Sequence, residues 1–377
     1  MTKRLALILT FCLFSGLQLF AEEKIDTEVN WRIRREETQN SQIMNLVRHL
    51  TDVYGPRLTG SPNFKAATDW SMKQMKQWGL QNENLEKWDF AHPGWSCDKY
   101  VVRVLSPYQD TLNARVVAWT PSTKGVVRAK TVQITPPERP TQESLTTYLN
   151  SVKDKIPGRI VLVGAYKEVP IQFNPAYKRR EDSELRAQYD PINPVPPFPP
   201  KPADRPADDP KPLEPRAIDE KTNAFLLENG ALVRVTDAAR SHGQIQVFAN
   251  NTFNTARAVP GIVIRNEDYG RISRLMADGI EIEMEVEISN TIHSEEQAAV
   301  NVIAEIPGSD LKDQVVMTGA HIDSWHAGTG ATDNATGVAV MMEAARILRN
   351  LGIKPRRTIR IALWGGEEQG LLGSKSQ

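Results

Sequence analysis

The side chains best suited to chemistry lie near the carboxyl end of the chain and comprise one imidazole and four carboxylates. They are His321, Asp323, Asp333 and the adjacent pair Glu367 and Glu368. Imidazole and carboxylate ligands suit Zn²⁺, and a catalytic zinc keeps one position open for water. These residue types in this spacing therefore predict a metal centre.

Each carboxylate can take a separate part in such a centre. A ligating imidazole needs its second nitrogen held by an acceptor, and Asp323 is close enough in sequence to His321 to provide one. Asp333 follows a glycine-rich turn and can bridge two ions about 3.5–4 Å apart. In the pair Glu367 and Glu368, one carboxylate can bind metal while the other moves a proton from metal-bound water to a leaving amine.

Taken singly, these residues also have ordinary interpretations. A lone histidine is more often structural, and paired glutamates are common on solvated surfaces. The segment Gly328-x-Gly330-x-x-Asp333 has part of a dinucleotide-binding pattern but lacks its third glycine. Serine-hydrolase and phosphate-binding-loop motifs do not occur in the sequence. We expect the other histidines to be structural or surface residues: His49, His92, His242, His293 and His326.

Alternating strands and a helix are expected to position the candidate ligands. Strands are predicted at Asn301–Ile306, Gln314–Ala320 and Thr358–Trp364, with an amphipathic helix at Thr336–Arg349. This alternation is typical of a parallel α/β sheet. The two loops with the candidate ligands follow the last two strands, where sites of open parallel sheets usually lie.

The earlier part of the chain divides by pattern. Residues 22–110 read as helices, including one at Asn63–Trp78, followed by one or two strands, and residues 111–290 as short strands. Three apolar runs are the clearest of these strands: Arg159–Gly164, Ala231–Val235 and Gly261–Ile264. Residues 191–215 contain eleven prolines, which favours an exposed insertion over a binding segment for proline-recognising partners. We expect residues 291–377 to form the first part of the catalytic core.

Composition narrows the functional classes. The chain has 377 residues, 40% hydrophobic, with 46 basic and 46 acidic side chains. This is ordinary globular usage, and without a basic excess we expect no nucleic-acid partner. Residues 1–21 have a positive start, an apolar run and Ala21 before acidic residues, which predicts a signal peptide rather than a membrane anchor. We therefore expect a periplasmic or secreted protein that is not held in a membrane after cleavage.

Cysteine usage is minimal. Only Cys12 and Cys97 occur, and Cys12 lies within the predicted signal peptide. The mature chain then has no intrachain disulfide, and it depends on its core or on bound metal for stability.

Taken together, the motifs resemble those of the co-catalytic di-zinc exopeptidases, a family that includes bacterial secreted aminopeptidases and plasma glutamate carboxypeptidase (carboxypeptidase Q). The similar segments are 316–325, 330–334, 357–360 and 364–374, with a weaker likeness at 54–61. The resemblance implies a parallel-sheet α/β peptidase core, a protease-associated domain inserted at 111–290, and two zinc ions. It also implies that His321 and Glu368 each bind one zinc and that Asp333 bridges them. Glu367 would be the general base and acid, and Asp323 would orient His321.

One departure qualifies the resemblance. The family's two further metal ligands, an acidic residue and a histidine, lie well downstream of the glutamate pair, whereas the chain stops at Gln377. We therefore expect a carboxyl-terminally truncated representative that binds zinc poorly and turns over slowly or not at all.

The predicted function is thus an exported zinc exopeptidase that cleaves peptides or dipeptides near a free terminus. Aminopeptidase and carboxypeptidase or dipeptidase specificities both remain open, as does the oligomeric state. The alternative is a non-catalytic binding ectodomain on the same scaffold. A receptor is free to lose the candidate ligands and base, and their presence here favours the enzyme.

Overall fold

The computed structural model describes residues 25–377 except 172, 174–179, 191, 193–210 and 294–298. The predicted signal peptide and most of the proline-rich segment lie outside the described residues. Within them, no helix is both long and apolar enough to cross a membrane.

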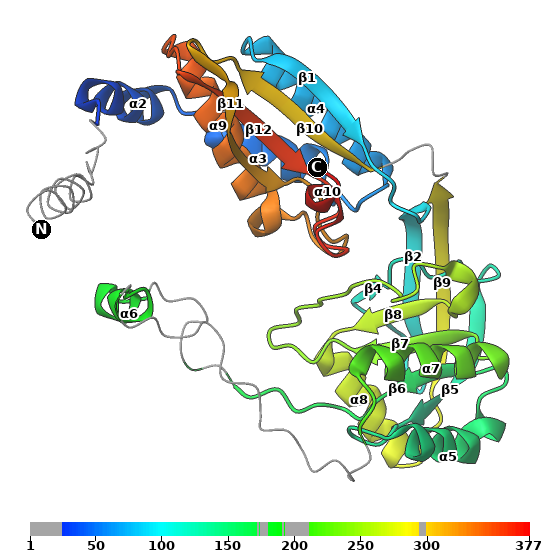
Figure 1. Ribbon diagram of the computed structural model, residues 1–377. Helices are drawn as coiled ribbons and strands as arrows, with labels where there is room; N and C mark the ends of the chain where they lie inside the picture. Colours follow the sequence, from blue (N-terminus) through cyan, green and yellow to red (C-terminus); the bar gives the residue numbers. More distant parts are fainter. Residues whose placement is uncertain (1–24, 172, 174–179, 191, 193–210, 294–298) are drawn as a thin grey trace, which may run out of the picture.

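The chain forms two units, each built around one sheet (Figure 1). The four-stranded unit has the order β1-β10-β12-β11, and the eight-stranded unit has the order β3-β2-β9-β5-β6-β7-β8-β4. The long strands β2 and β9 pair with one another and extend from the second unit toward the first. This α/β architecture confirms the predicted fold class.

The elements of the four-stranded unit come from both ends of the chain. They are α2 Thr27–Asn40, α3 Ile43–Arg48, a π-helical turn His49–Val53, α4 Pro62–Gln77, β1 Gln81–Lys87, β10 Val300–Ile306, β11 Leu311–His321, a π-helical turn Ala331–Ala335, α9 Thr336–Asn350, β12 Arg357–Trp364 and α10 Leu372–Lys375. The expected strands and helices of this part are present to within a few residues. The prediction that this sheet is parallel is wrong for β10: the sheet is mixed, because β11 and β12 are parallel whereas β10 and β1 run antiparallel to their neighbours.

Local sequence explains the two helices that pack on this sheet. Helix α4 begins where the Ser61 side chain accepts a hydrogen bond from the Phe64 N–H, with Pro62 in the first turn. Its apolar face joins that of α9 in one buried cluster with the strands. Strand β11 lies at the edge of the sheet, where Val315, Val316 and Met317 are exposed.

The eight-stranded unit comprises most of the middle of the chain. Its elements are β2 Gly94–Ser106, β3 Asp110–Thr111, β4 Ala114–Val116, β5 Val127–Ile134, α5 Gln142–Val152, a 3₁₀ turn Lys153–Lys155, β6 Ile160–Val163, α6 Asp182–Gln188, α7 Pro215–Glu228, β7 Val233–Asp237, a 3₁₀ turn Thr255–Arg257, β8 Gly261–Ile264, α8 Asn266–Ala277 and β9 Glu283–His293. Strand β2 lies before the boundary expected at residue 110 yet pairs along its length with β9.

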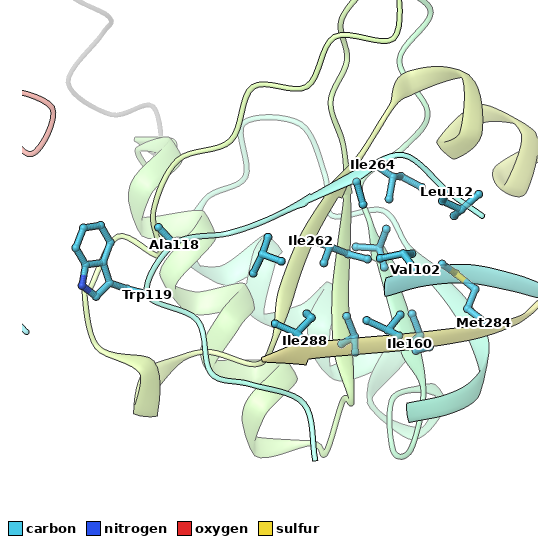
Figure 2. Close-up of a cluster of buried hydrophobic side chains, with 14 of the residues drawn as sticks. Val102, Leu112, Ala118, Trp119, Ile160, Ile262, Ile264, Met284 and Ile288 are labelled. Carbon is cyan, nitrogen blue, oxygen red and sulfur yellow. The ribbon is translucent and has the colours of Figure 1, made fainter. Parts of the chain in front are cut away.

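Both faces of this sheet are buried. Alternate residues of β6 enter different clusters, with Ile160 and Leu162 in one and Val161 in the other. Figure 2 shows part of the first cluster, in which Ile160 lies with Ile262 of β8 and Ile288 of β9. The continuous apolar run of β6 follows from this burial, because β5 to β8 are parallel and helices cover them.

Candidate metal centre

The two loops that contain the predicted ligands meet at one edge of the four-stranded sheet. Strand β11 ends at His321, which lies opposite Trp364, the last residue of the parallel strand β12. Gly365 and Gly366 then lead directly into the glutamate pair. Because parallel strands place their carboxyl ends at the same edge, the sheet itself brings the loops together.

Three of the predicted residues form a cluster that could hold a cation. One ligand atom each from His321, Asp333 and Glu368 lies within 4.8 Å of the others. His321 Nε2 lies 3.0 Å from Asp333 Oδ1. The imidazole is largely buried, with 12% of the side chain exposed, whereas 72% of the Asp333 side chain is exposed. The cluster therefore opens to solvent on the Asp333 side.

Asp323 lies beneath this cluster and links both loops. Its fully buried carboxylate accepts hydrogen bonds from the backbone N–H groups of Glu367 and Glu368, each at 3.2 Å. His321 Nδ1 lies 3.4 Å from Asp323 Oδ1 and 3.2 Å from the Asp323 carbonyl oxygen. An N–H at Nδ1 facing these acceptors leaves Nε2 with its lone pair directed at the cluster.

The charges around the cluster favour a bound cation. Burial disfavours a charged His321, but its hydrogen bond with Asp323 and the charges of Asp323, Glu367 and Asp333 outweigh burial and raise its pKa to about 9. Burial, together with Asp333 and Asp323, raises the pKa of Glu368 to about 7. Crowded anions retain protons because their negative charges repel one another, and a divalent ion would replace those protons. The donor types and their charge thus fit zinc.

Glu367 differs from its neighbour in its setting. Its Oε2 lies 3.9 Å from His321 Nε2, and 37% of its side chain is exposed. Within the described residues it is not part of the three-residue cluster. Glu368 therefore faces the cation position, while Glu367 lies beside it with a carboxylate free to exchange protons.

The segment between α3 and α4 contributes two residues to the centre that the sequence signalled only through the weak likeness at 54–61. Thr59 Oγ1 donates to Asp323 Oδ2 at 3.1 Å and accepts from the Gly366 N–H at 3.2 Å. The guanidinium of Arg57 is fully buried. It donates to backbone carbonyls of Ile322, Thr329 and Gly330 in the loop after β11, and to those of Leu50 and Gly55. Arg57 therefore fixes both ends of the loop that connects His321 to Asp333.

The loop after β11 also contacts the eight-stranded unit. His326 Nε2 donates to the Val116 carbonyl oxygen at 2.6 Å, and Arg115 Nε donates to the Ala327 carbonyl oxygen at 3.1 Å. Burial lowers the pKa of His326 to about 4, so its imidazole is neutral. His326 is thus a structural residue, as the sequence indicated.

The ends of the parallel strands β11 and β12 thus gather a histidine and several carboxylates, the donor types that bind zinc. Residues 301–377 match the sequence profile of peptidase family M28. Carboxypeptidase Q of Bos taurus is 25% identical over 332 residues, which cover 86% of this chain and 58% of that protein. The chain thus spans little more than half the length of this curated relative.

Solved structures show the same fold. The M28 peptidase precursor of Shewanella amazonensis aligns with a TM-score of 0.59 and 24% identity, over 93% of this chain and 69% of that one. The zinc aminopeptidase of Bacillus subtilis aligns with a TM-score of 0.53 and 16% identity, over 89% and 63%. Residues 301–377 are therefore similar in sequence to the M28 peptidases, and the chain shares its fold with the solved M28 peptidase structure.

Proposed function

We propose that the protein is a zinc exopeptidase that hydrolyses peptide bonds near a free terminus, as an aminopeptidase or as a carboxypeptidase or dipeptidase. The observation that supports this most directly is the cluster of His321, Asp333 and Glu368 with Glu367 beside it. A purely structural cluster would not need a further carboxylate beside it, that of Glu367, with access to solvent. The relatives' names, carboxypeptidase Q and zinc aminopeptidase, agree with this activity.

His321, Asp333 and Glu368 would hold the metal. As the family resemblance implies, two zinc ions would be held here, one by His321 and one by Glu368, with Asp333 shared between them. When bound, zinc would lower the pKa of a water molecule and polarise the peptide carbonyl that this water attacks. Asp323 holds the imidazole in the tautomer that presents Nε2, and Thr59 holds Asp323.

Glu367 would serve as the general base and acid. Its carboxylate is half-exposed beside the cluster, so it can accept a proton and deliver it to the leaving amine. Its backbone N–H is fixed on Asp323, which sets the position of the side chain relative to His321.

The remaining proposals concern the setting of the enzyme. We propose export to the periplasm or the exterior, because residues 1–21 have the layout of a signal peptide. We also propose that the eight-stranded unit is an inserted protease-associated domain. It interrupts the four-stranded unit, whose strands β1 and β10 lie on either side of it in the sequence.

The test separates metal binding from proton transfer. At saturating zinc, we expect Glu367→Gln to retain as much bound zinc as wild type but to lower the slow peptide hydrolysis expected of this chain by about 10²–10⁴-fold. Loss of a residue that only hydrogen-bonds a metal ligand lowers metal affinity by roughly 10–100-fold. His321→Ala removes a ligand itself and should lower zinc affinity by more than that. Glu220→Gln is a matched control, because Glu220 has a similarly exposed side chain, at 38%, and lies on α7.

Zinc content is measured by elemental analysis after dialysis, and hydrolysis by release of free amino acids from short peptides. Equal zinc binding by wild type and His321→Ala would refute the proposed centre. Normal zinc binding without hydrolysis of any peptide would favour the binding-ectodomain alternative.

A further inference from the structure

A cavity of about 440 Å³ adjoins the candidate metal centre, and its two sides come from different units. Asp333 and Glu368 line one side, together with Trp325 from the loop after β11. Segment 244–248 of the eight-stranded unit lines the opposite side. A substrate bound at the metal would therefore contact residues far from the catalytic sheet in sequence.

Phe248 is the aromatic residue of that opposite side. Its ring lies edge-on to Trp325, with the ring centroids 5.2 Å apart. Although 48% of Phe248 is exposed, its neighbour Val247 is buried. An exposed aromatic ring beside a metal centre gains stability when an apolar group covers it, because that removes apolar surface from water.

The backbone holds Phe248 in this place. Its carbonyl accepts from the Ala118 N–H at 3.0 Å, and the Asn250 N–H donates to the Ala118 carbonyl oxygen at 2.8 Å. Trp325 is held on the same part of the unit, since the next residue, His326, donates to the Val116 carbonyl. The chain next to both rings is thus anchored on the stretch 116–118, which places Phe248 and Trp325 beside one another.

We propose that Phe248 is a specificity-determining residue, which with Trp325 receives a large apolar side chain of the substrate next to the scissile bond. The preferred substrates are then peptides with leucine-like or aromatic residues at that position rather than glycine. This inference rests on the proposed function, because the position of the scissile bond is set by the metal centre.

The test uses two ligands with the same metal-chelating head. Binding of leucine hydroxamate and glycine hydroxamate to the zinc-saturated full chain is measured by calorimetry, which does not require turnover. We expect leucine hydroxamate to bind wild type at least about tenfold more tightly, as a pocket that accepts several methylene groups allows. Phe248→Ala should reduce that ratio about fivefold or more, and Phe248→Leu should retain an intermediate ratio.

Tyr108→Ala is the matched control, since Tyr108 is 43% exposed and packs on Arg271 away from this cavity. It should leave the ratio unchanged. Equal binding of the two hydroxamates to wild type, or an unchanged ratio in Phe248→Ala, would overturn the inference and leave the zinc centre standing. Failure of wild type to bind either hydroxamate would instead overturn the proposed function, and the inference with it.

Discussion

Replacing Arg57 with methionine should loosen the metal centre without touching a ligand. The change removes five hydrogen bonds from a fully buried guanidinium, three of them to the loop that connects His321 to Asp333. Methionine is of similar length and fills much of the same space. The carbonyls of Ile322, Thr329 and Gly330 would then lose this partner, as would two others before the loop, those of Leu50 and Gly55.

The magnitude follows from the number of carbonyls left unpaired. Each buried acceptor without a partner costs about 1–3 kcal/mol, and some of the five carbonyls can relax toward solvent. Burial lowers the pKa of Arg57 to about 10, so the side chain is still charged at neutral pH, and the charge of Asp323 helps to keep it so. We expect the free energy of unfolding to fall by about 3–5 kcal/mol, the range for breaking a buried charged interaction.

The decisive measurement is zinc affinity, with Arg346→Met as the control. Arg346 is another buried arginine with several hydrogen bonds, to Glu36 and Glu343, but it joins α2 to α9 away from the ligands. Both variants should unfold at lower urea concentration. Only Arg57→Met should weaken zinc binding in the folded protein, by about 10–100-fold. If the two variants lose zinc affinity equally, Arg57 has no specific role in positioning the centre.

Two further variants test neighbouring contacts. Thr59→Val preserves shape but removes the hydroxyl, so Asp323 Oδ2 and the Gly366 N–H lose the partner that they share. The free energy of unfolding, measured by urea denaturation, should fall by about 1–3 kcal/mol. Zinc affinity, measured by zinc titration, should fall as well. His326 has its pKa lowered to about 4 by burial, so the unfolded chain takes up a proton below about pH 6.5 that the folded chain does not. The stability that the neutral His326 contributes is therefore full above pH 6.5 and is lost as the pH falls toward 4, by up to about 3 kcal/mol. In the zinc-free protein, His326→Gln should lose less unfolding free energy than wild type between pH 7 and 4.5. An equal loss in the two proteins would contradict this explanation.

The secondary structure near the centre could be predicted because its signals are local. The apolar runs of β10 and β12 and the amphipathic face of α9 follow from burial on a sheet. The direction of β10 and the pairing of β2 with β9 depend instead on contacts between residues far apart in sequence. A pattern of a single strand contains no information about its partner.

The same distinction holds for the site. The residue types and spacing of the ligands indicated a metal centre, and the structure brings His321, Asp333 and Glu368 together. The residue types and spacing around Arg57 and Phe248 contain no such signal, because an arginine in a breaker-rich loop and an aromatic residue in an irregular segment are individually ordinary, and Arg57 was indicated only by the likeness at 54–61. Their positions become meaningful only when the chain is folded, since each contacts the loop after β11 from a different segment.

Asp323 shows why the donors cannot be considered apart from the rest of the fold. Its buried carboxylate faces His321. It accepts hydrogen bonds from the Thr59 hydroxyl and from the backbone N–H groups of Glu367 and Glu368. A buried carboxylate is costly unless such partners are all present, so a change in any one segment alters the position of the others. The metal centre is therefore a product of three segments that meet at one residue. Its affinity should respond to mutations in segment 55–61, which contains no ligand, as well as to mutations of the ligands themselves.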